Sequence, residues 1–596
     1  MTRSIQARRA RALAATTAAG LALGTLAVAG TTGTAVSAEP AADCAAPYDA
    51  SLLQRGDAVT GLTVDEGTTP EAFTGEVIGV LDDGIAAGLD MIMIELDSEA
   101  IQRAGGIWQG MSGSPVYVGD QLVGAVAYGL SWGPSPIAGV TPFSEMDDYL
   151  GRSTQRPAAK VAVSDSAARA IARDSDVSRS QAAQGFSQLP VPMGVAGMSA
   201  SRLAQAQRYA ADQGKGYLAP STYAAGRIGR DTARAAAPES VVAGGNMAAS
   251  ISYGDVSYAG VGTVTSVCDG EVVGFGHPFN FLGATTLGLH PADALYVQPD
   301  SLGAPFKVAN IAPPTGMIDN DRLTGISGVF GTLPDAATIT STVTYGERSR
   351  TGSSDIYFTP FSADVTFGQQ IVNHDRVIDG IVAGGEDLSW TIEGTDETGA
   401  PFTLSWADRY ISNFDITFEA SWDLADTVYN LSRLPDVSIE SITTDAAVDD
   451  DDSSIKLVAV EQLRGGEWTK VGRRYGIQAE RGQLLRVRAV LKAADESLSY
   501  VPFSTRIGKK AQSGFLNVMG GASDWISIWG AKSVAEIQEA YAKAASNDQV
   551  VFNLRMKGNG GKVNVTSEDQ ASVVTGRKGY FVSVDGGRGG PQCRGC

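Results

Sequence analysis

One serine of the chain lies in a setting suited to nucleophilic chemistry. The segment GMSGSP, residues 110–115, is followed by apolar residues and a Gly119-Asp120 turn. A tight glycine-containing loop can aim its own backbone N–H groups at the oxygen of a reacting carbonyl, because glycine adopts dihedral angles that other residues avoid. We therefore take Ser112 as the candidate nucleophile, and the N–H groups of Gly110 and Ser112 as the candidate oxyanion hole.

A serine hydroxyl needs an adjacent base, and this chain offers few. It contains three histidines, His277, His290 and His374. His277 lies in GFGHPF, where an apolar strand ends in a glycine-rich turn and an imidazole can project into a cleft. His290 and His374 have the pattern of ordinary loop or strand-end residues. We therefore expect His277 to be the general base.

The serine and histidine segments also allow other interpretations. The Gly-x-Ser-x-Gly elbow of α/β-hydrolases requires a second glycine where Ser114 stands, and a helix behind it that Pro115 and the following strand pattern exclude. The segment can also be a plain Gly/Ser turn of a hairpin. The histidines lack the spacing of a zinc site, and we expect no metal and no cofactor.

The elements that position these residues are mainly strands. Residues 49–150 contain short apolar or alternating runs bounded by Gly and Asp, and strand patterns return in SYAGVGTVTSVCDGEVVGFGHPF, which holds the Asp269-Gly270 hairpin turn. Alternation in LSWTIEG, PFTLSW and LLRVRAVL indicates hairpins with one buried face. The acidic run Asp449–Asp452 is typical of a solvated linker, with a calcium site as the alternative.

The chain of 596 residues is expected to form several folded units, because one hydrophobic core rarely serves so long a chain. We predict the following segments: a signal peptide at 1–38, a half carrying the serine at 45–150, a partly helical Ala/Arg/Ser-rich connection at 151–240, a half carrying the histidine at 241–335, a β-rich extension at 336–430, a β-sandwich at 431–580 and a Gly/Arg/Cys tail at 581–596.

The N-terminal segment predicts export. Four arginines precede an Ala/Gly/Leu/Thr stretch, and Val36-Ser37-Ala38 forms a small-residue cleavage site. The stretch is too diluted by Thr and Gly for a stable membrane anchor. Its removal changes the formal net charge from −20 to −24, and so acidic a surface repels nucleic acid. We expect a secreted or envelope-associated protein.

The chain has four cysteines, Cys44, Cys268, Cys593 and Cys596. An even number outside the cytoplasm favours disulfides. Cys593 and Cys596 are spaced like a redox or zinc pair, but they lie in a terminal tail without the strand-to-helix setting of a thioredoxin site. A bond between Cys44 and Cys268 would tie the serine and histidine segments together.

The segments GGIWQGMSGSPVYVGDQLVGAVAYG and GFGHPF resemble the SpoIVB peptidase family of trypsin-like serine peptidases. Supporting stretches are GLTVDEGTTPEAF, AGVTPFSEM, GTVTSVCDGEVVGFGHPF and GMIDNDRLTGISGVFG, so that the resemblance covers roughly residues 50–150 and 240–335. It implies a mainly β fold with a trypsin-like double β-barrel core, and a Ser/His pair with a supporting Asp. The Ser/His pair carries onto Ser112 and His277.

The family position of the acid matches Asp97, at the end of the segment MIMIELD. Asp90, Asp269 and Asp293 are alternatives. In the sporulation peptidases the histidine segment precedes the serine segment, whereas here the order is swapped. The resemblance implies an exported serine endopeptidase that cleaves protein substrates through an acyl-enzyme; whether it also cleaves itself is left open by the sequence. The swapped order motivates a second hypothesis, an inactive envelope scaffold or binding protein that retains the peptidase fold.

Overall fold

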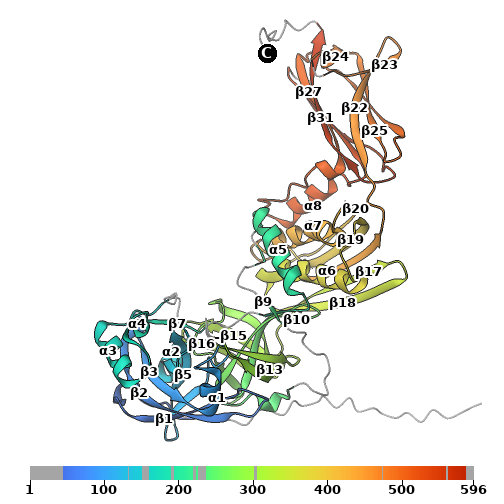
Figure 1. The fold of residues 1–596 in the computed structure, drawn as a ribbon. Coiled ribbons are helices and arrows are strands. Elements are labelled where there is room, and N and C mark those ends of the chain that lie inside the picture. The colour runs from blue at the N-terminus through green and yellow to red at the C-terminus, as the bar shows by residue number, and fades with distance from the viewer. Residues whose placement is uncertain are drawn as a thin grey trace, which may run out of the picture. The chain divides into compact units, whose positions relative to one another are not determined.

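A computed structural model describes residues 44–131, 133–150, 160–189, 194–215, 217–218, 223–225, 236–300, 305–472, 474–558 and 561–585. The tail cysteines Cys593 and Cys596 and the predicted signal peptide lie outside these residues. The described chain is mainly strand, arranged in two barrels, a sheet covered by helices, and a sandwich (Figure 1). The predicted fold class is confirmed.

The first barrel contains six strands and carries the serine. Its sheet closes because β4 pairs with β1 as well as with β5, in the order β4-β1-β2-β3-β6-β5. The strands are β1 (Ala58–Thr63), β2 (Glu71–Ala86), β3 (Leu89–Asp97), β4 (Pro115–Val118), β5 (Gln121–Leu130) and β6 (Ile137–Pro142), with helices α1 (Glu99–Ala104) and α2 (Phe143–Leu150).

The second barrel carries the histidine and closes in the same way. Its strands follow the order β10-β13-β15-β16-β12-β11, and β11 returns to β10. They are β10 (Asn246–Gly254), β11 (Ser257–Cys268), β12 (Glu271–Gly274), β13 (Gly283–Gln298), β15 (Gly316–Arg322) and β16 (Gly325–Phe330), with β14 (Phe306–Ile311) beside β13. The Asp269-Gly270 turn joins β11 to β12, as the sequence predicts.

The connection between the barrels contains helices and short strands. Its elements are α3 (Asp165–Asp174), α4 (Arg179–Ala182), β7 (Phe186–Gln188), β8 (Gly194–Ala196), α5 (Ala200–Asp212) and β9 (Tyr223–Ala225). Strand β7 pairs with β5 of the first barrel, whereas β8 pairs with β11 of the second. The chain therefore passes from one barrel to the other between β7 and β8.

The next unit differs from the β-rich extension that we predicted. Five strands form the order β20-β19-β21-β17-β18, and two long helices pack on them (Figure 1). The elements are β17 (Ala337–Tyr345), β18 (Arg348–Ile356), α6 (Ser362–Ile378), β19 (Gly384–Thr395), β20 (Pro401–Ser412), α7 (Ile416–Leu431) and β21 (Ser438–Asp449). Helix α6 is buried on nearly every side, polar residues included, so its sequence shows no apolar stripe of helical period.

The C-terminal sandwich starts at β22, later than residue 431, because β21 joins the preceding sheet. One sheet has β22 (Ile455–Arg464), β23 (Glu467–Lys470), β25 (Leu484–Lys492), β26 (Leu498–Arg506) and β30 (Val574–Thr575); the other has β24 (Ile477–Glu480), β27 (Ser513–Gly520), β28 (Val550–Met556), β29 (Lys562–Thr566) and β31 (Arg577–Asp585), with α8 (Val534–Ala542) between β27 and β28. Leu485, Val487, Ala489 and Leu491 of β25 are buried in its core, as the alternation predicts.

Candidate active site

The serine loop lies between α1 and β4, and its glycines hold conformations that other residues rarely adopt. Gly110 has φ 94° and Gly113 has φ 97°. A Cβ atom on Gly113 would lie 1.9 Å from the carbonyl oxygen of Thr263 in the second barrel. The loop must therefore contain glycine at position 113 for the two barrels to approach this closely.

Strand β11 of the second barrel supports the same loop through hydrogen bonds. The Thr263 N–H donates to Ser112 O over 2.8 Å, and the Thr263 hydroxyl donates to Gly110 O over 3.0 Å. The Thr265 hydroxyl donates to Gly113 O over 2.8 Å. These bonds fix the position of the serine relative to the second barrel.

His277 lies in the turn that follows β12, and the structure brings it to the serine. Its Nε2 atom lies 2.8 Å from Ser112 Oγ, although 165 residues separate them in the chain. Phe275 and Gly276 both have φ 67°, which turns the chain sharply just before the imidazole. The Thr141 hydroxyl of the first barrel donates to Gly276 O over 2.7 Å and holds this turn against the serine barrel.

The other ring nitrogen of His277 has two close neighbours. Its Nδ1 atom lies 2.8 Å from Pro278 O and 2.8 Å from Gln188 Nε2. The carbonyl oxygen can only accept a hydrogen bond and the amide nitrogen can only donate one, so these two contacts do not by themselves fix the tautomer. A general base needs the tautomer with the proton on Nδ1, in which the Nε2 lone pair faces the Ser112 hydroxyl. Burial lowers the pKa of His277 to about 4, while the bond to Pro278 opposes this shift. The imidazole is thus neutral near pH 7, as a general base must be.

A buried carboxylate shapes the loop that follows His277. Asp321 of β15 accepts hydrogen bonds from the N–H groups of Phe279, Asn280 and Leu282 at 2.7–3.1 Å. Burial raises the pKa of Asp321, and these N–H groups oppose the shift. We did not identify Asp321 from the sequence, although it lies in the stretch GMIDNDRLTG that supports the family resemblance.

The N–H groups of the two proposed oxyanion donors differ from those of their neighbours in the loop. In the described part of the chain, the N–H groups of Gly110 and Ser112 donate to no backbone carbonyl. The neighbouring N–H groups of Met111 and Gly113 are used within the fold, by Trp108 O and Val126 O. The proposal of these two donors is therefore compatible with the backbone hydrogen bonds of the described loop.

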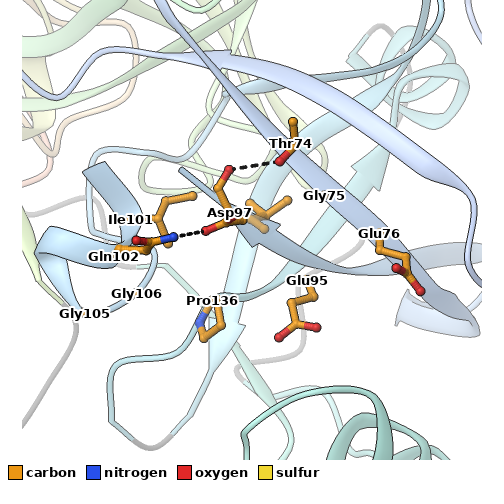
Figure 2. Close-up of a pocket in the computed structure, with 11 residues that line it drawn as sticks. Thr74, Gly75, Glu76, Glu95, Asp97, Ile101, Gln102, Gly105, Gly106 and Pro136 are labelled. Carbon is orange, nitrogen blue, oxygen red and sulfur yellow. Dashed lines mark hydrogen bonds between the residues drawn. The ribbon is translucent and has the colours of Figure 1, made fainter. Parts of the chain in front are cut away.

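The structure does not bring Asp97 to the histidine. Asp97 is exposed, and its Oδ1 accepts a hydrogen bond of 2.7 Å from Gln102 Nε2 on α1. It lines a surface pocket together with Glu95 and Glu76, and neither Ser112 nor His277 lines this pocket (Figure 2). Asp97 is the last residue of β3, directly before Ser98, which caps helix α1, and it does not lie beside the imidazole. The expectation that it orients His277 is therefore corrected: Pro278 O and Gln188 Nε2 face the Nδ1 atom of the imidazole instead.

The other two histidines are not loop or strand-end residues. His290 lies within β13, fully buried, with Nε2 2.6 Å from Ser250 Oγ and Nδ1 2.8 Å from Ala312 O. His374 lies in α6 and pairs with Glu386. Ser250 and His290 form a second buried serine–histidine pair, which lies on two barrel strands and not on a glycine loop.

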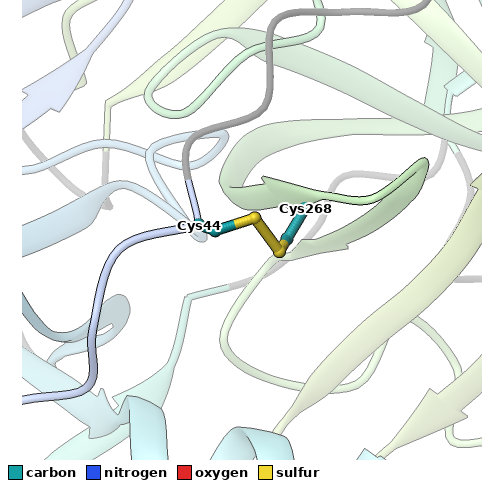
Figure 3. The surroundings of a disulfide bond; sticks show 2 residues. All are labelled: Cys44 and Cys268. Atoms are coloured by element: carbon teal, nitrogen blue, oxygen red, sulfur yellow. A yellow bond between two sulfur atoms is a disulfide. The ribbon is translucent and has the colours of Figure 1, made fainter.

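Cys44 and Cys268 form a disulfide (Figure 3). Residues just after Cys44 attach to the first barrel, because Tyr48 N donates to Leu122 O and Leu122 N donates to Ala46 O. Cys268 ends β11 of the second barrel. The bond therefore joins the serine barrel to the histidine barrel, and it is one of the pairings that the sequence leaves open.

A pair of six-stranded barrels with a serine and a histidine where they meet defines a double-barrel peptidase fold. Residues 25–140 match the family model described as SpoIVB peptidase S55. The match includes Ser112, ends before His277, and confirms the resemblance to this family over the segment that it covers. It supports a peptidase function in general.

A search of curated proteins and a search of solved structures found no match to the chain. Among the described helices, none has the length and apolar character needed to cross a membrane.

Proposed function

We propose that the chain is an exported serine endopeptidase with Ser112 as nucleophile and His277 as general base. The observation that carries the proposal is the 2.8 Å approach of His277 Nε2 to Ser112 Oγ, made by two segments from different barrels. The family match supports the peptidase class, and the N-terminal sequence pattern supports export to the cell envelope or beyond.

The mechanism follows from the positions of the polar atoms. Ser112 Oγ attacks the scissile carbonyl carbon while its proton passes to His277 Nε2. The N–H groups of Gly110 and Ser112 stabilise the oxyanion, a contribution of about a hundredfold to a thousandfold per donor. The imidazolium then gives the proton to the leaving amine, and an acyl-enzyme remains. Water, deprotonated by the same imidazole, hydrolyses the acyl-enzyme and restores the serine.

The Pro278 carbonyl orients the imidazole in this scheme. In the productive tautomer it accepts a hydrogen bond from the Nδ1–H. A neutral carbonyl stabilises an imidazolium less than a carboxylate does, so the base strength of His277 depends on the surrounding protein more than in a triad with an acid.

Labelling by a fluorophosphonate probe tests the proposal. Because Ser112 is fully buried, the reaction of the protein lacking residues 1–38 is followed over hours. We expect label on Ser112, none in Ser112→Ala, and at least a hundredfold slower labelling in His277→Ala.

The second serine–histidine pair supplies a matched control. Ser250→Ala and His290→Gln alter a pair with a similar hydrogen bond and similar burial, and circular dichroism checks that each variant folds. These variants should keep the label. Label that persists in Ser112→Ala would refute the assignment.

A further inference from the structure

The serine and the histidine are both fully buried, so a substrate must displace something before it reaches them. The structure shows what lies beside them. The Gln188 Nε2 atom lies 2.8 Å from His277 Nδ1 and donates to Pro278 O over 2.9 Å. Gln188 belongs to β7, in the connection between the barrels. We call residues Phe186–Leu189 the inhibitory strand.

The inhibitory strand adds to a sheet edge next to the nucleophile. Along this edge of β5, Gly113 N donates to Val126 O and Val126 N donates to Ser114 O. One residue further on, Leu189 N donates to Ala127 O over 3.0 Å. The register between β5 and β6 shifts between Val126 and Tyr128, and bulges of this kind are common next to active sites. At this bulge the Val126 carbonyl accepts a hydrogen bond from the serine loop, and the Ala127 carbonyl accepts one from Leu189.

Beyond Ala127, the pairing continues as a regular antiparallel ladder. Tyr128 pairs with Gln188, Gly129 with Ser187, and Leu130 with Phe186. Addition of an extended segment to an exposed strand edge is a general mode of peptide recognition, in which main-chain bonds give affinity and side-chain pockets give specificity. The inhibitory strand thus has the backbone geometry of a bound peptide that ends beside the serine loop.

The side chain of Leu189 fills an apolar pocket. It is 3% exposed and belongs to the core cluster that contains Ile107, Trp108 and Met111, the residues that lead into the serine loop. A Cβ atom on Gly129 would lie 3.1 Å from Leu189 Cδ2 and 3.2 Å from Ile107 Cδ1. The absence of a side chain at position 129 therefore leaves room for a leucine in this pocket.

We propose that Phe186–Leu189 occupies the groove used by protein substrates, as an internal inhibitor. The site would then accept an extended segment with a leucine-sized apolar side chain next to the scissile bond. This inference rests on the proposed function for its catalytic consequence, whereas the occupation of the groove can be tested without catalysis.

A binding experiment tests whether the groove is occupied without depending on catalysis. The fluorescent peptide Gly-Phe-Ser-Gln-Leu, which has the sequence of residues 185–189, is titrated by anisotropy against Ser112→Ala and against Ser112→Ala/Leu189→Asp. The aspartate places a charge in the apolar pocket and expels the inhibitory strand. We expect at least tenfold tighter binding to the double variant, and no binding when aspartate replaces the peptide's leucine. Equal binding to both variants, or binding to neither, would overturn the proposal.

Catalytic variants complete the test. Leu189→Asp should raise the rate of fluorophosphonate labelling at least tenfold, whereas Gln184→Asp, an exposed change in the same connection, should leave it unchanged. Gly129→Val in the Leu189→Asp background should lower cleavage of peptides with leucine before the scissile bond at least tenfold relative to those with alanine. If the peptide binds as expected but neither Leu189→Asp nor the wild type is labelled, the groove assignment survives and the peptidase assignment fails.

Discussion

The disulfide between the barrels should contribute strongly to stability, and its removal gives a quantitative test. Cys44 and Cys268 are 224 residues apart. In the chain-entropy description, a crosslink that closes a loop of this length lowers the entropy of the unfolded chain enough to stabilise the native state by about 5 kcal/mol. We expect the double variant Cys44→Ser/Cys268→Ser to lose up to this amount, since local structure in the unfolded chain reduces the effect.

The assay must report on the barrels alone, because a chain with several folded units does not unfold in one step. Hydrogen exchange of the β11 and β12 amides in increasing denaturant gives that local free energy of opening. The matched control is Cys593→Ser/Cys596→Ser, which removes the same number of sulfur atoms from the tail. Loss of less than about 1 kcal/mol in the Cys44/Cys268 variant, or an equal loss in the control, would show that noncovalent contacts alone hold the barrels together.

Three further outcomes are expected. Gly113→Ala, which puts a Cβ atom 1.9 Å from Thr263 O, should slow labelling of the serine at least about a hundredfold as the loop and its oxyanion donors shift. Burial lowers the pKa of His277 to about 4, and a base with a lowered pKa stays unprotonated further into acid. In Leu189→Asp, exposure of His277 should return the pKa of its imidazole towards about 6.5. As the pH is lowered, the labelling rate of the wild type should therefore begin to fall at a lower pH than the rate of this variant; identical pH profiles would contradict this. Asp97→Asn should change the rate less than about threefold, against about 10⁴ for a triad acid, and a larger loss would restore Asp97 to the mechanism.

Much of the fold could be predicted from local patterns. Alternation in β19, β20 and β25 gave strands with a buried face, and the Asp269-Gly270 turn gave a hairpin, because these features depend on neighbours in sequence. Helices α6 and α7 were missed in a segment that we predicted to be β-rich. Buried polar groups such as Gln369 and His374 remove the amphipathic period that marks a surface helix.

In the candidate site, too, some residues could be predicted from the sequence and others could not. Ser112 and His277 could be chosen because glycine-rich loops and scarce histidines leave signals in the sequence. Asp97 was chosen because it matches the family position of the acid, yet a matched position in the sequence does not determine which side chains converge. One of the two groups that face the Nδ1 atom of His277 is a backbone carbonyl, that of Pro278, and a carbonyl has no sequence signature. Gln188 was missed because its position depends on the pairing of β7 with β5.

The chain that follows the inhibitory strand is anchored to a different unit. Helix α5 begins soon after β8, and its Arg202 pairs with Asp375 of α6 and with Asp415 next to α7. Tyr209 of α5 stacks on Trp422 of α7, with ring centroids 4.6 Å apart. Between α5 and β7 lies β8, which pairs with β11 of the second barrel, so a load applied to these two helices reaches the second barrel before it reaches β7. Helices α6 and α7 are thus coupled through α5 to the barrel that carries the histidine.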